Sequence, residues 1–261
     1  MPVVRMAPDT LNQENVKFAQ MRLSAPVFLN SVPKSGSHLL KNIVRMFVPV
    51  EQQYLEQAIQ WPNLKQHLRA FDPRMNYMSW GHLLYSDMSV IELKGVRKIV
   101  LVRDPYNWVL ARARFFLSDE FKGNIDHVKG GAISIDELLN LMIFGVYQKA
   151  PPMSEVYTFN AVAWLGSGAA VLKYEDLVAH LRKFDTPEAE AYFKRLLDHC
   201  GIAMPADWRE RVRIGADRKF SGTARENLTG LPFEIPDELP DVQKRLVDFA
   251  APGLRAVLGY A

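Results

Sequence analysis

Three short apolar runs, each rich in β-branched residues, constrain the fold of this chain more than any other feature. They read PVFLNSV (26–32), RKIVLVRD (97–104) and AAVLKYED (169–176). Runs that are almost continuously apolar, rather than alternating, are typical of strands buried on both faces of a parallel sheet. A fourth run, NYMSWGHL (76–83), alternates less cleanly and is also interpreted as a strand.

Helical patterns separate these strands. Apolar residues recur at helical spacing over 37–47, 107–117, 136–147, 154–165, 187–199 and 240–249, and Asn107 could cap the second of these helices. Strands that alternate with helices predict crossover connections, and therefore an α/β domain of three layers with a central parallel β-sheet flanked by helices. Glycine and polar residues over 123–131 and 221–236 predict loops.

Size and composition favour one domain. The chain has 261 residues, of which 48% are hydrophobic, and this is enough for one sizeable core. No repeat or clear linker divides the sequence, so we predict a single domain over 1–261. The 32 basic and 29 acidic residues give a net charge of only +3, which is too balanced for a general nucleic-acid binder.

The single cysteine, Cys200, excludes an intrachain disulfide and fits a reducing compartment, so a cytoplasmic location is expected. It is interpreted as a packed core residue rather than a catalytic thiol, because free cysteines are usually buried. The N-terminal residues include no continuous apolar segment and carry acidic side chains, so no signal peptide is expected. No apolar stretch is long enough to cross a bilayer.

The segment VPKSGSH, directly after the first strand, predicts an anion site. In a parallel sheet, ligands bind beyond the carboxyl ends of the strands. Backbone N–H groups of a short loop and of a helix N-terminus can point at an anion there, and Lys34 adds a mobile positive charge. The Walker A pattern G-x-x-x-x-G-K-[ST] is absent. The alternative is an ordinary strand-to-helix turn with an exposed lysine.

The longer segment VPKSGSHLL resembles the 5′-phosphosulfate loop of sulfotransferases that use 3′-phosphoadenosine 5′-phosphosulfate (PAPS), in which P-K-[ST]-G-[ST]-[ST]-W is typical. His38 stands where a hydroxyl residue is usual, and Leu39 stands where tryptophan makes an aromatic contact with the nucleotide. The resemblance implies a nucleotide-binding set of Lys34, Ser35, Gly36, Ser37, His38 and Leu39.

A second strand end, KIVLVRDPYNWVLARARFF, resembles the 3′-phosphate motif of the same family. Arg103 matches the arginine that binds the 3′-phosphate, a role suited to a planar guanidinium. Ala111 stands where the family has a serine, so either one hydrogen bond is lost or a neighbour such as Arg112 or Arg114 replaces it. The alternative is that Arg103 only neutralises Asp104 or caps the sheet edge.

GHLLYS resembles the context of the family's catalytic histidine, and His82 lies 21 residues before Arg103, close to the family's spacing. Leu84 stands where proline is common. The resemblance implies that His82 is the general base, because a neutral imidazole can take the proton of an attacking hydroxyl. His38 is a rival for this role, although a nucleotide or acceptor contact is the preferred interpretation for it.

Two further segments extend the resemblance. VLKYEDL resembles the family's YEDL segment, in which the tyrosine lies near adenine, so Tyr174 is either a nucleotide contact or a core tyrosine. DRKFSGTARENLTG resembles the C-terminal pattern R-K-G-x-x-G-x-W-[KR]-N with a one-residue gap, the alternative being a solvated basic loop. The residues matched in it are Arg218, Lys219, Gly222, Arg225 and Asn227.

The resemblance implies a fold like that of the P-loop nucleoside triphosphatases. It also implies a reaction: in-line transfer of a sulfuryl group from PAPS to a hydroxyl or amine acceptor, which leaves 3′-phosphoadenosine 5′-phosphate (PAP). Lys34 would stabilise charge on the bridging oxygen. The acceptor would be a small molecule or a glycan, and no metal is expected. Residues 49–75 and 118–168 should line or cover the acceptor pocket. The alternatives are an ATP-dependent kinase and a nucleotide-binding scaffold without turnover.

Overall fold

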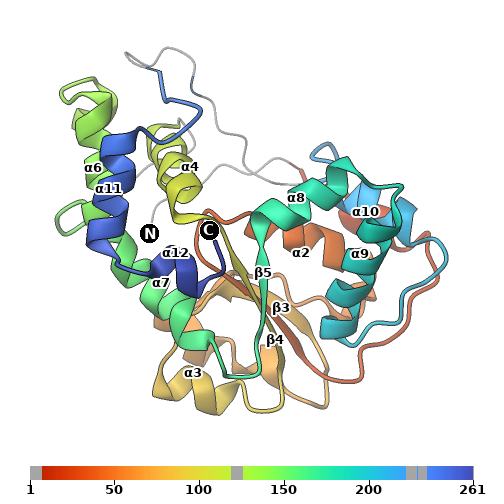
Figure 1. Ribbon diagram of the computed structural model, residues 1–261. Coiled ribbons are helices and arrows are strands. Elements are labelled where there is room, and N and C mark those ends of the chain that lie inside the picture. Colours follow the sequence, from red (N-terminus) through yellow and green to blue (C-terminus); the bar gives the residue numbers. More distant parts are fainter. Residues whose placement is uncertain (1–7, 119–125, 222–227, 229–233, 261) are drawn as a thin grey trace. The chain divides into compact units, whose positions relative to one another are not determined.

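The structure is a computed structural model, and it describes residues 8–118, 126–221, 228 and 234–260. The chain divides into two compact units (Figure 1). Of the described residues, the sheet unit comprises 8–102 and 159–221, and the helical unit comprises 103–118, 126–158, 228 and 234–260. The single-domain organisation inferred from the sequence stays a prediction.

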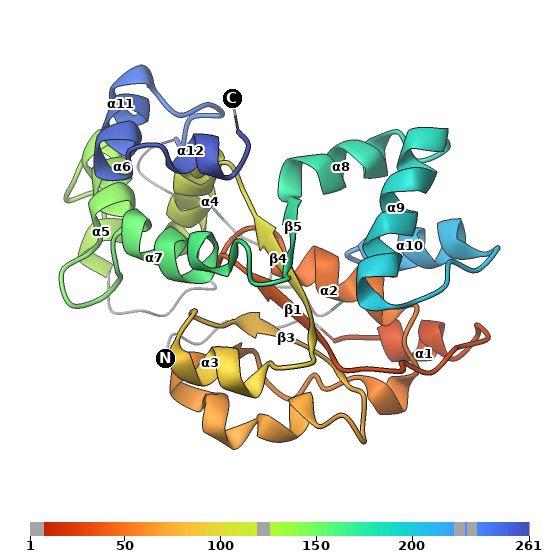
Figure 2. The ribbon, with the colours of Figure 1, turned by 60° about the horizontal axis from the view of Figure 1, so that its bottom comes forward.

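The sheet unit contains five parallel strands in the order β2-β3-β1-β4-β5. Figure 2 shows β1 between β3 and β4. The α/β class with a central parallel sheet flanked by helices is thereby confirmed, as are the four strands predicted from apolar runs. The two-residue strand β2 was not predicted. The strands are β1 Val27–Ser31, β2 Ile59–Gln60, β3 Met78–His82, β4 Arg97–Val102 and β5 Ala170–Lys173.

Both faces of the sheet are covered, and this explains the continuous apolar runs. Side chains alternate across a strand, so Leu29 faces the core that contains Ile43 and Phe193 of the helices. Phe28, on the opposite face, meets Phe71 edge-on with ring centroids 5.5 Å apart. The helices of this unit are α1 Leu11–Asn15, α2 Ser37–Arg45, α3 Asp87–Glu92, α8 Tyr174–Arg182, α9 Pro187–Cys200 and α10 Trp208–Ala216, with short 3-10 turns at Val50–Gln52, Trp61–Gln66, Leu68–Phe71 and Val162–Trp164.

In the helical unit, α4, α6 and α11 pack against one another. Their buried side chains include Trp108, Leu139 and Val247, which form the apolar interior of this unit. The last two residues of helix α7 belong to the sheet unit. The helices are α4 Pro105–Leu117, α5 Asp126–Lys129, α6 Ile135–Phe144, α7 Met153–Asn160, α11 Asp241–Ala250 and α12 Leu254–Val257.

Several predicted boundaries were wrong for identifiable reasons. Asn107 does not cap α4, because the Asp104 carboxylate accepts from the backbone N–H of Tyr106 and Pro105 takes the first helical position. The run at 169–176 leaves the sheet after Lys173, and Tyr174 already begins α8. Helix α5 forms inside the loop predicted over 123–131, and the helix predicted over 154–165 ends early and continues as a 3-10 turn.

Cys200 is a core residue, as predicted. Its side chain is buried, and burial raises the pKa of the thiol to about 12, so the reactive thiolate is disfavoured. Among the described residues, none of the helices combines the length and the apolar character that crossing a bilayer requires.

Candidate active site

The turn between β1 and α2 is short and conformationally unusual. The backbone N–H of Ser35 donates to the carbonyl of Val32 (3.1 Å), and α2 begins at Ser37. Lys34 has a φ of 69° and Gly36 a φ of 91°. A lysine in the left-handed region is strained, and strain of this kind is found at ligand sites. The strain fits a ligand site at this turn, and the binding of an anion there stays a prediction.

The ring of Tyr174 lies against this turn. A Cβ atom built on Gly36 would come within 2.5 Å of Cδ2 of Tyr174, so no larger residue fits at position 36 without displacing the ring. Tyr174 is half-buried and packs on the core. The end of the third predicted strand is thus brought to the first, as the resemblance implies.

Ser31, the last residue of β1, links the turn to His82, the last residue of β3. Its hydroxyl donates to the hydroxyl of Ser37 (2.7 Å). Nδ1 of His82 lies 3.1 Å from the carbonyl oxygen of Ser31 and 3.1 Å from its hydroxyl. A carbonyl oxygen can only accept, so this contact places the proton of the neutral imidazole on Nδ1. Nε2 then keeps its lone pair.

His82 is neutral at pH 7. Burial lowers the pKa of its imidazole to about 4, and the positive charge of Lys34 acts in the same direction. The hydrogen bond to the Ser31 carbonyl opposes this shift because it favours the protonated form. A neutral imidazole with a defined tautomer meets the structural requirement for a general base.

His38, the rival base, is the second residue of α2. The pKa of its imidazole is lowered to about 3. Burial is the largest cause, and the positive charges of Lys41, His82 and Lys34 are smaller causes that act in the same direction. Its ring meets Trp80 edge-on at 5.0 Å, and its Nδ1 is buried with no hydrogen-bond partner among the described residues. Its tautomer is therefore not set by a hydrogen bond at Nδ1, in contrast to that of His82.

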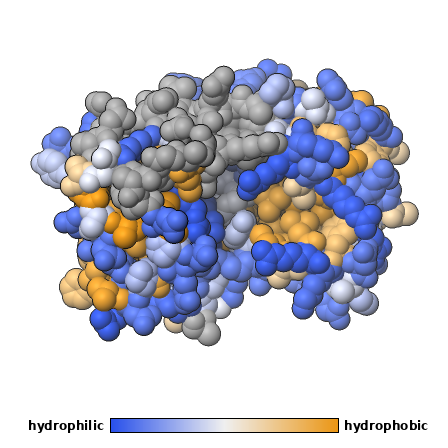
Figure 3. Space-filling view, turned by 90° about the horizontal axis from the view of Figure 1, so that it is seen from above, coloured by the Kyte–Doolittle hydropathy of each residue, from blue (hydrophilic) through white to orange (hydrophobic). Residues whose placement is uncertain are grey.

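The remaining loop residues differ in their surroundings. The Ser35 hydroxyl is fully buried and has no hydrogen-bond partner in the described part of the chain. Leu39 is half-buried and packs on the core. Leu181 of α8 and Ile214 of α10 are partly buried and pack on the same core. Figure 3 shows an apolar area bordered by hydrophilic side chains on the surface over α8 and α10.

Arg103 is the first residue of the helical unit and directly follows β4. Its carbonyl accepts a hydrogen bond from the Tyr157 hydroxyl (2.7 Å). The Asp104 carboxylate receives Nε and Nη2 of Arg255 at 3.1 and 3.0 Å. Asp104 therefore has a bidentate counter-charge from α12, and its neutralisation does not require Arg103.

The two arginines named from the sequence as neighbours of Ala111 both donate to backbone carbonyls. Arg112 is buried, donates to the carbonyls of Met142 (2.9 Å) and Pro151 (2.7 Å), and lies over the ring of Trp108. Burial lowers the pKa of its guanidinium to about 10. Arg114 donates to the carbonyl of Pro236. The choice between the two alternatives for Ala111 stays a prediction.

Of the C-terminal basic segment, only the beginning is described. Arg218 and Lys219 are exposed, and Lys219 pairs with Asp217 at 3.2 Å. Gly222, Arg225 and Asn227 lie outside the described residues. The role of this segment stays a prediction.

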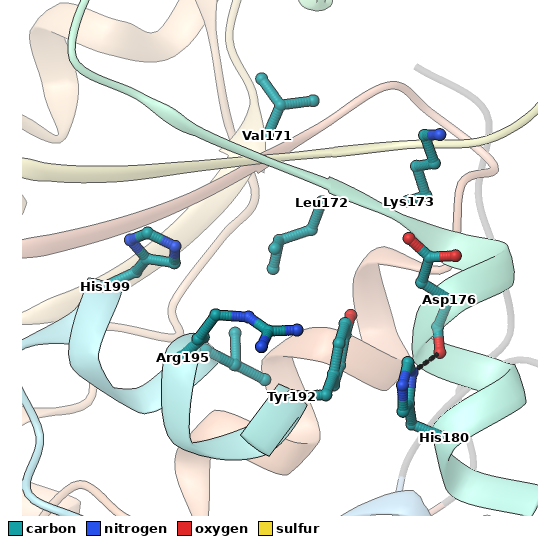
Figure 4. A pocket seen from close by; sticks show the side chains of 9 residues that line it. Val171, Leu172, Lys173, Asp176, His180, Tyr192, Arg195 and His199 are labelled. Atoms are coloured by element: carbon teal, nitrogen blue, oxygen red, sulfur yellow. Dashed lines mark hydrogen bonds between the residues drawn. The ribbon is translucent and has the colours of Figure 1, made fainter. Parts of the chain in front are cut away.

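A pocket of about 240 Å³ that was not predicted lies at the edge strand β5, between α8 and α9 (Figure 4). The rings of His180 and Tyr192 stack there at 4.3 Å, and Nδ1 of His180 donates to the backbone carbonyl of Asp176. Burial raises the pKa of the Tyr192 hydroxyl. Its lining carries charges of both signs, so we interpret it as a packing gap. It is lined by Val171, Leu172, Lys173, Asp176, His180, Tyr192, Arg195, Leu196 and His199.

Comparisons with known proteins agree with this architecture. No protein family model matches the chain, and no curated protein sequence does. Mouse sulfotransferase SULT7A1, in a crystal structure complexed with PAP, is similar over 92% of this chain and 86% of its own, with a TM-score of 0.54 and 14% identity. A sulfotransferase domain from the curacin biosynthetic pathway matches over 92% and 99%, with 14% identity and a TM-score of 0.41. At this identity the first likeness shows a shared fold, and the TM-score of the second is too low to add to it.

Proposed function

We propose that this protein is a sulfotransferase that moves a sulfuryl group from PAPS to a hydroxyl or amine acceptor. The observation that carries the proposal is the connection through Ser31 between an anion-binding turn and a neutral imidazole with its Nε2 lone pair available. The fold shared with a sulfotransferase that was crystallised with PAP supports it. The single buried thiol fits a cytoplasmic enzyme.

The turn would hold the phosphosulfate of the donor. Backbone N–H groups at the start of α2, the Ser35 hydroxyl and the Lys34 ammonium are all donors, as an anion requires. Lys34 would stabilise the negative charge that develops on the bridging oxygen as the sulfur–oxygen bond breaks. In this proposal Arg103 binds the 3′-phosphate, and Tyr174 and Leu39 contact the adenine.

His82 would take the proton of the acceptor. As the acceptor oxygen forms its bond to sulfur, its proton passes to Nε2, and the bond from sulfur to the phosphate oxygen breaks to release PAP. The Ser31 carbonyl holds the Nδ1 proton and stabilises the imidazolium that forms. An anionic donor beside the ring would raise the pKa of His82 and make it a stronger base at neutral pH.

Isothermal titration calorimetry with PAP and with ATP, each with and without Mg²⁺, tests this proposal against an ATP-dependent kinase. We expect PAP to bind more tightly than ATP and without need of the metal. Tight, Mg²⁺-dependent ATP binding with no PAP binding would overturn the proposal. Formation of a sulfated product from any acceptor, a small molecule or a glycan, would exclude a scaffold without turnover.

A further inference from the structure

A second group of nitrogen-bearing side chains lies next to the base, and it comes from two elements of the sheet unit. His38 and Lys41 are three residues apart on α2 and so share a face of that helix. Nζ of Lys41 lies 4.3 Å from the ring centroid of Trp80 on β3, and the His38 ring lies 5.0 Å from it. The His82 ring is 6.2 Å from the same indole. Trp80 is therefore the centre of this group.

Lys41 is a buried cation without a counter-ion in the described part of the chain. Only 7% of the residue is exposed, and its ammonium makes no hydrogen bond or ion pair with a described residue. The carboxylate that influences it, Asp9, is bound by both terminal nitrogens of Arg45 at 2.7 and 3.1 Å. Burial and the Arg45 charge lower the pKa of Lys41 to about 8.

The contact with Trp80 does not offset this burial. A cation–π contact is weaker than the cost of removing an ammonium from water. A buried lysine of this kind is retained at a cost in stability. That cost is expected where a ligand supplies the missing charge.

The ring nitrogens of the same group are also unsatisfied. Trp80 is 9% exposed, and its Nε1 has no hydrogen-bond partner among the described residues, as is the case for Nδ1 of His38. An indole N–H and an ammonium can only donate. A ligand that satisfies both must therefore offer acceptors, and the positive charge favours an oxyanion.

We propose that Lys41, Trp80 and His38 form a subsite for a sulfonate or carboxylate group next to the base. The inference rests on the proposed function and deepens it. Two sources share this chemistry: the sulfuryl group in transfer, and a fixed anionic group on the acceptor. The positive charges of Lys34 and Lys41 both lower the pKa of His38, and that of Lys34 also lowers the pKa of His82.

Calorimetry with inorganic sulfate and with benzoate, on protein first saturated with PAP, tests the subsite. We expect both anions to bind the wild type and to bind Lys41→Met about tenfold or more weakly, the effect of losing a charged hydrogen bond. Trp80→Phe keeps an aromatic ring but removes the indole N–H, and we expect it to weaken anion binding several-fold. Lys65→Met removes an exposed lysine of the same unit and should change nothing.

Equal anion binding by the wild type and Lys41→Met, or no binding to the wild type, overturns the inference. Thermal unfolding of each variant checks that it folds, and Lys41→Arg, which keeps the charge, should retain most of the affinity. If PAP fails to bind while sulfate still distinguishes the wild type from Lys41→Met, the subsite stands and the proposed function fails.

Kinetics separates the two sources. If the subsite holds the sulfuryl group in transfer, Lys41→Met lowers kcat for a neutral alcohol as well as for a carboxylate-bearing acceptor of similar size. If it holds a group on the acceptor, the variant raises KM for the carboxylate-bearing acceptor alone. A variant with wild-type kcat and KM for both acceptors contradicts the subsite.

Discussion

The surroundings of the turn in the sheet unit and the cluster around Asp104 in the helical unit differ in how far their charged and polar groups are paired. Around the turn, Lys41 is buried without a counter-ion, and nitrogen atoms of His38 and Trp80 have no partner among the described residues. Beyond Arg103, the carboxylate of Asp104 is paired bidentately with Arg255. In the same cluster, the Tyr106 hydroxyl donates to Asp248 at 2.9 Å, and the Arg255 guanidinium lies 4.1 Å from the Tyr106 ring.

The contrast separates groups that would meet a ligand from groups that position them. Donors left unsatisfied in a folded chain are costly, so they are expected where a substrate completes them. Paired charges fix the backbone from which a binding side chain projects. Substitution of Lys34 or His82, which would act on the reacting atoms, should therefore change turnover strongly, and substitutions in the second region should change affinity moderately.

The largest effect is expected at His82. His82→Asn should lower kcat for an alcohol acceptor by about two to four orders of magnitude, because a positioned base is lost. PAP affinity should stay close to that of the wild type, and the loss should be smaller for acidic phenols. His38→Asn is the matched comparison and should lose less turnover than His82→Asn, because it leaves the base in place. Loss of activity in His38→Asn alone would move the base to His38.

Lys34→Ala should come next, with kcat lowered by about two to three orders of magnitude. The reason is that its charge acts on an oxygen that becomes more negative toward the transition state. Single-turnover kinetics with saturating donor separates this effect from binding. A variant that loses donor affinity but keeps the wild-type rate at saturation would show that Lys34 only binds.

Arg103→Ala should weaken PAP binding by about 1.5–3 kcal/mol, the value for a hydrogen bond to a charged group. Calorimetry with PAP and with adenosine 5′-monophosphate shows whether the loss is specific to the 3′-phosphate. Unchanged PAP affinity would contradict the assignment of Arg103.

Arg255→Ala should also weaken the binding of PAP more than that of adenosine 5′-monophosphate, but by less than Arg103→Ala does. Removing Arg255 leaves the Asp104 carboxylate without its bidentate partner, next in sequence to Arg103, and this negative charge opposes a phosphate. Both side chains are partly exposed, so we expect a loss of about 0.5–1 kcal/mol in PAP affinity. Arg245→Ala, an exposed arginine on α11, is the control. Equal losses for adenosine 5′-monophosphate would indicate a general structural effect.

The lowered pKa values of His38 and His82 predict that the free energy of unfolding decreases at acid pH. The folded-state pKa values of His38 and His82, about 3 and about 4, lie below the unfolded value near 6.5. Their contribution is complete above pH 6.5 and is lost as the pH falls toward 4, by an amount on the order of 3 kcal/mol for His82. Nuclear magnetic resonance titration should find both rings neutral at pH 6. In the free enzyme, kcat/KM should fall only as the pH approaches about 4.

The fold was predictable where one physical pattern dominates. Strands β1, β4 and β5 are covered on both faces, so their apolar runs stand out. Strand β2 has two residues, too few for any pattern. The start of α4 was predicted two residues too late because more than one nearby residue can cap a helix. Which residue does so depends on the backbone conformation of Asp104, and the sequence does not reveal it.

The candidate site was predictable only as far as motif spacing reaches. Lys34 and Arg103 follow strands β1 and β4, and His82 is the last residue of β3, so all three lie at strand ends, where the resemblance places them. The contact between Ser31 and His82 depends on the pairing of β1 with β3, and the contact between Lys41 and Trp80 depends on the rotation of α2. The sequence offered two signals for these contacts. Ser31 is a polar residue at the end of an apolar strand, and Lys41 is a lysine among the apolar positions of a predicted helix. Arg255 lies 151 residues after Asp104, beyond any local pattern.

Transfer of labelled sulfate tests the central claim most directly. Wild type and His82→Asn would be incubated with ³⁵S-labelled PAPS and a panel of alcohols, phenols, amines and glycans, in the presence of a metal chelator. We predict a labelled product and an equal amount of PAP with the wild type, and a far slower reaction with His82→Asn. No labelled product from any acceptor, together with transfer of the γ-phosphoryl group of ATP once Mg²⁺ is supplied, would contradict the account.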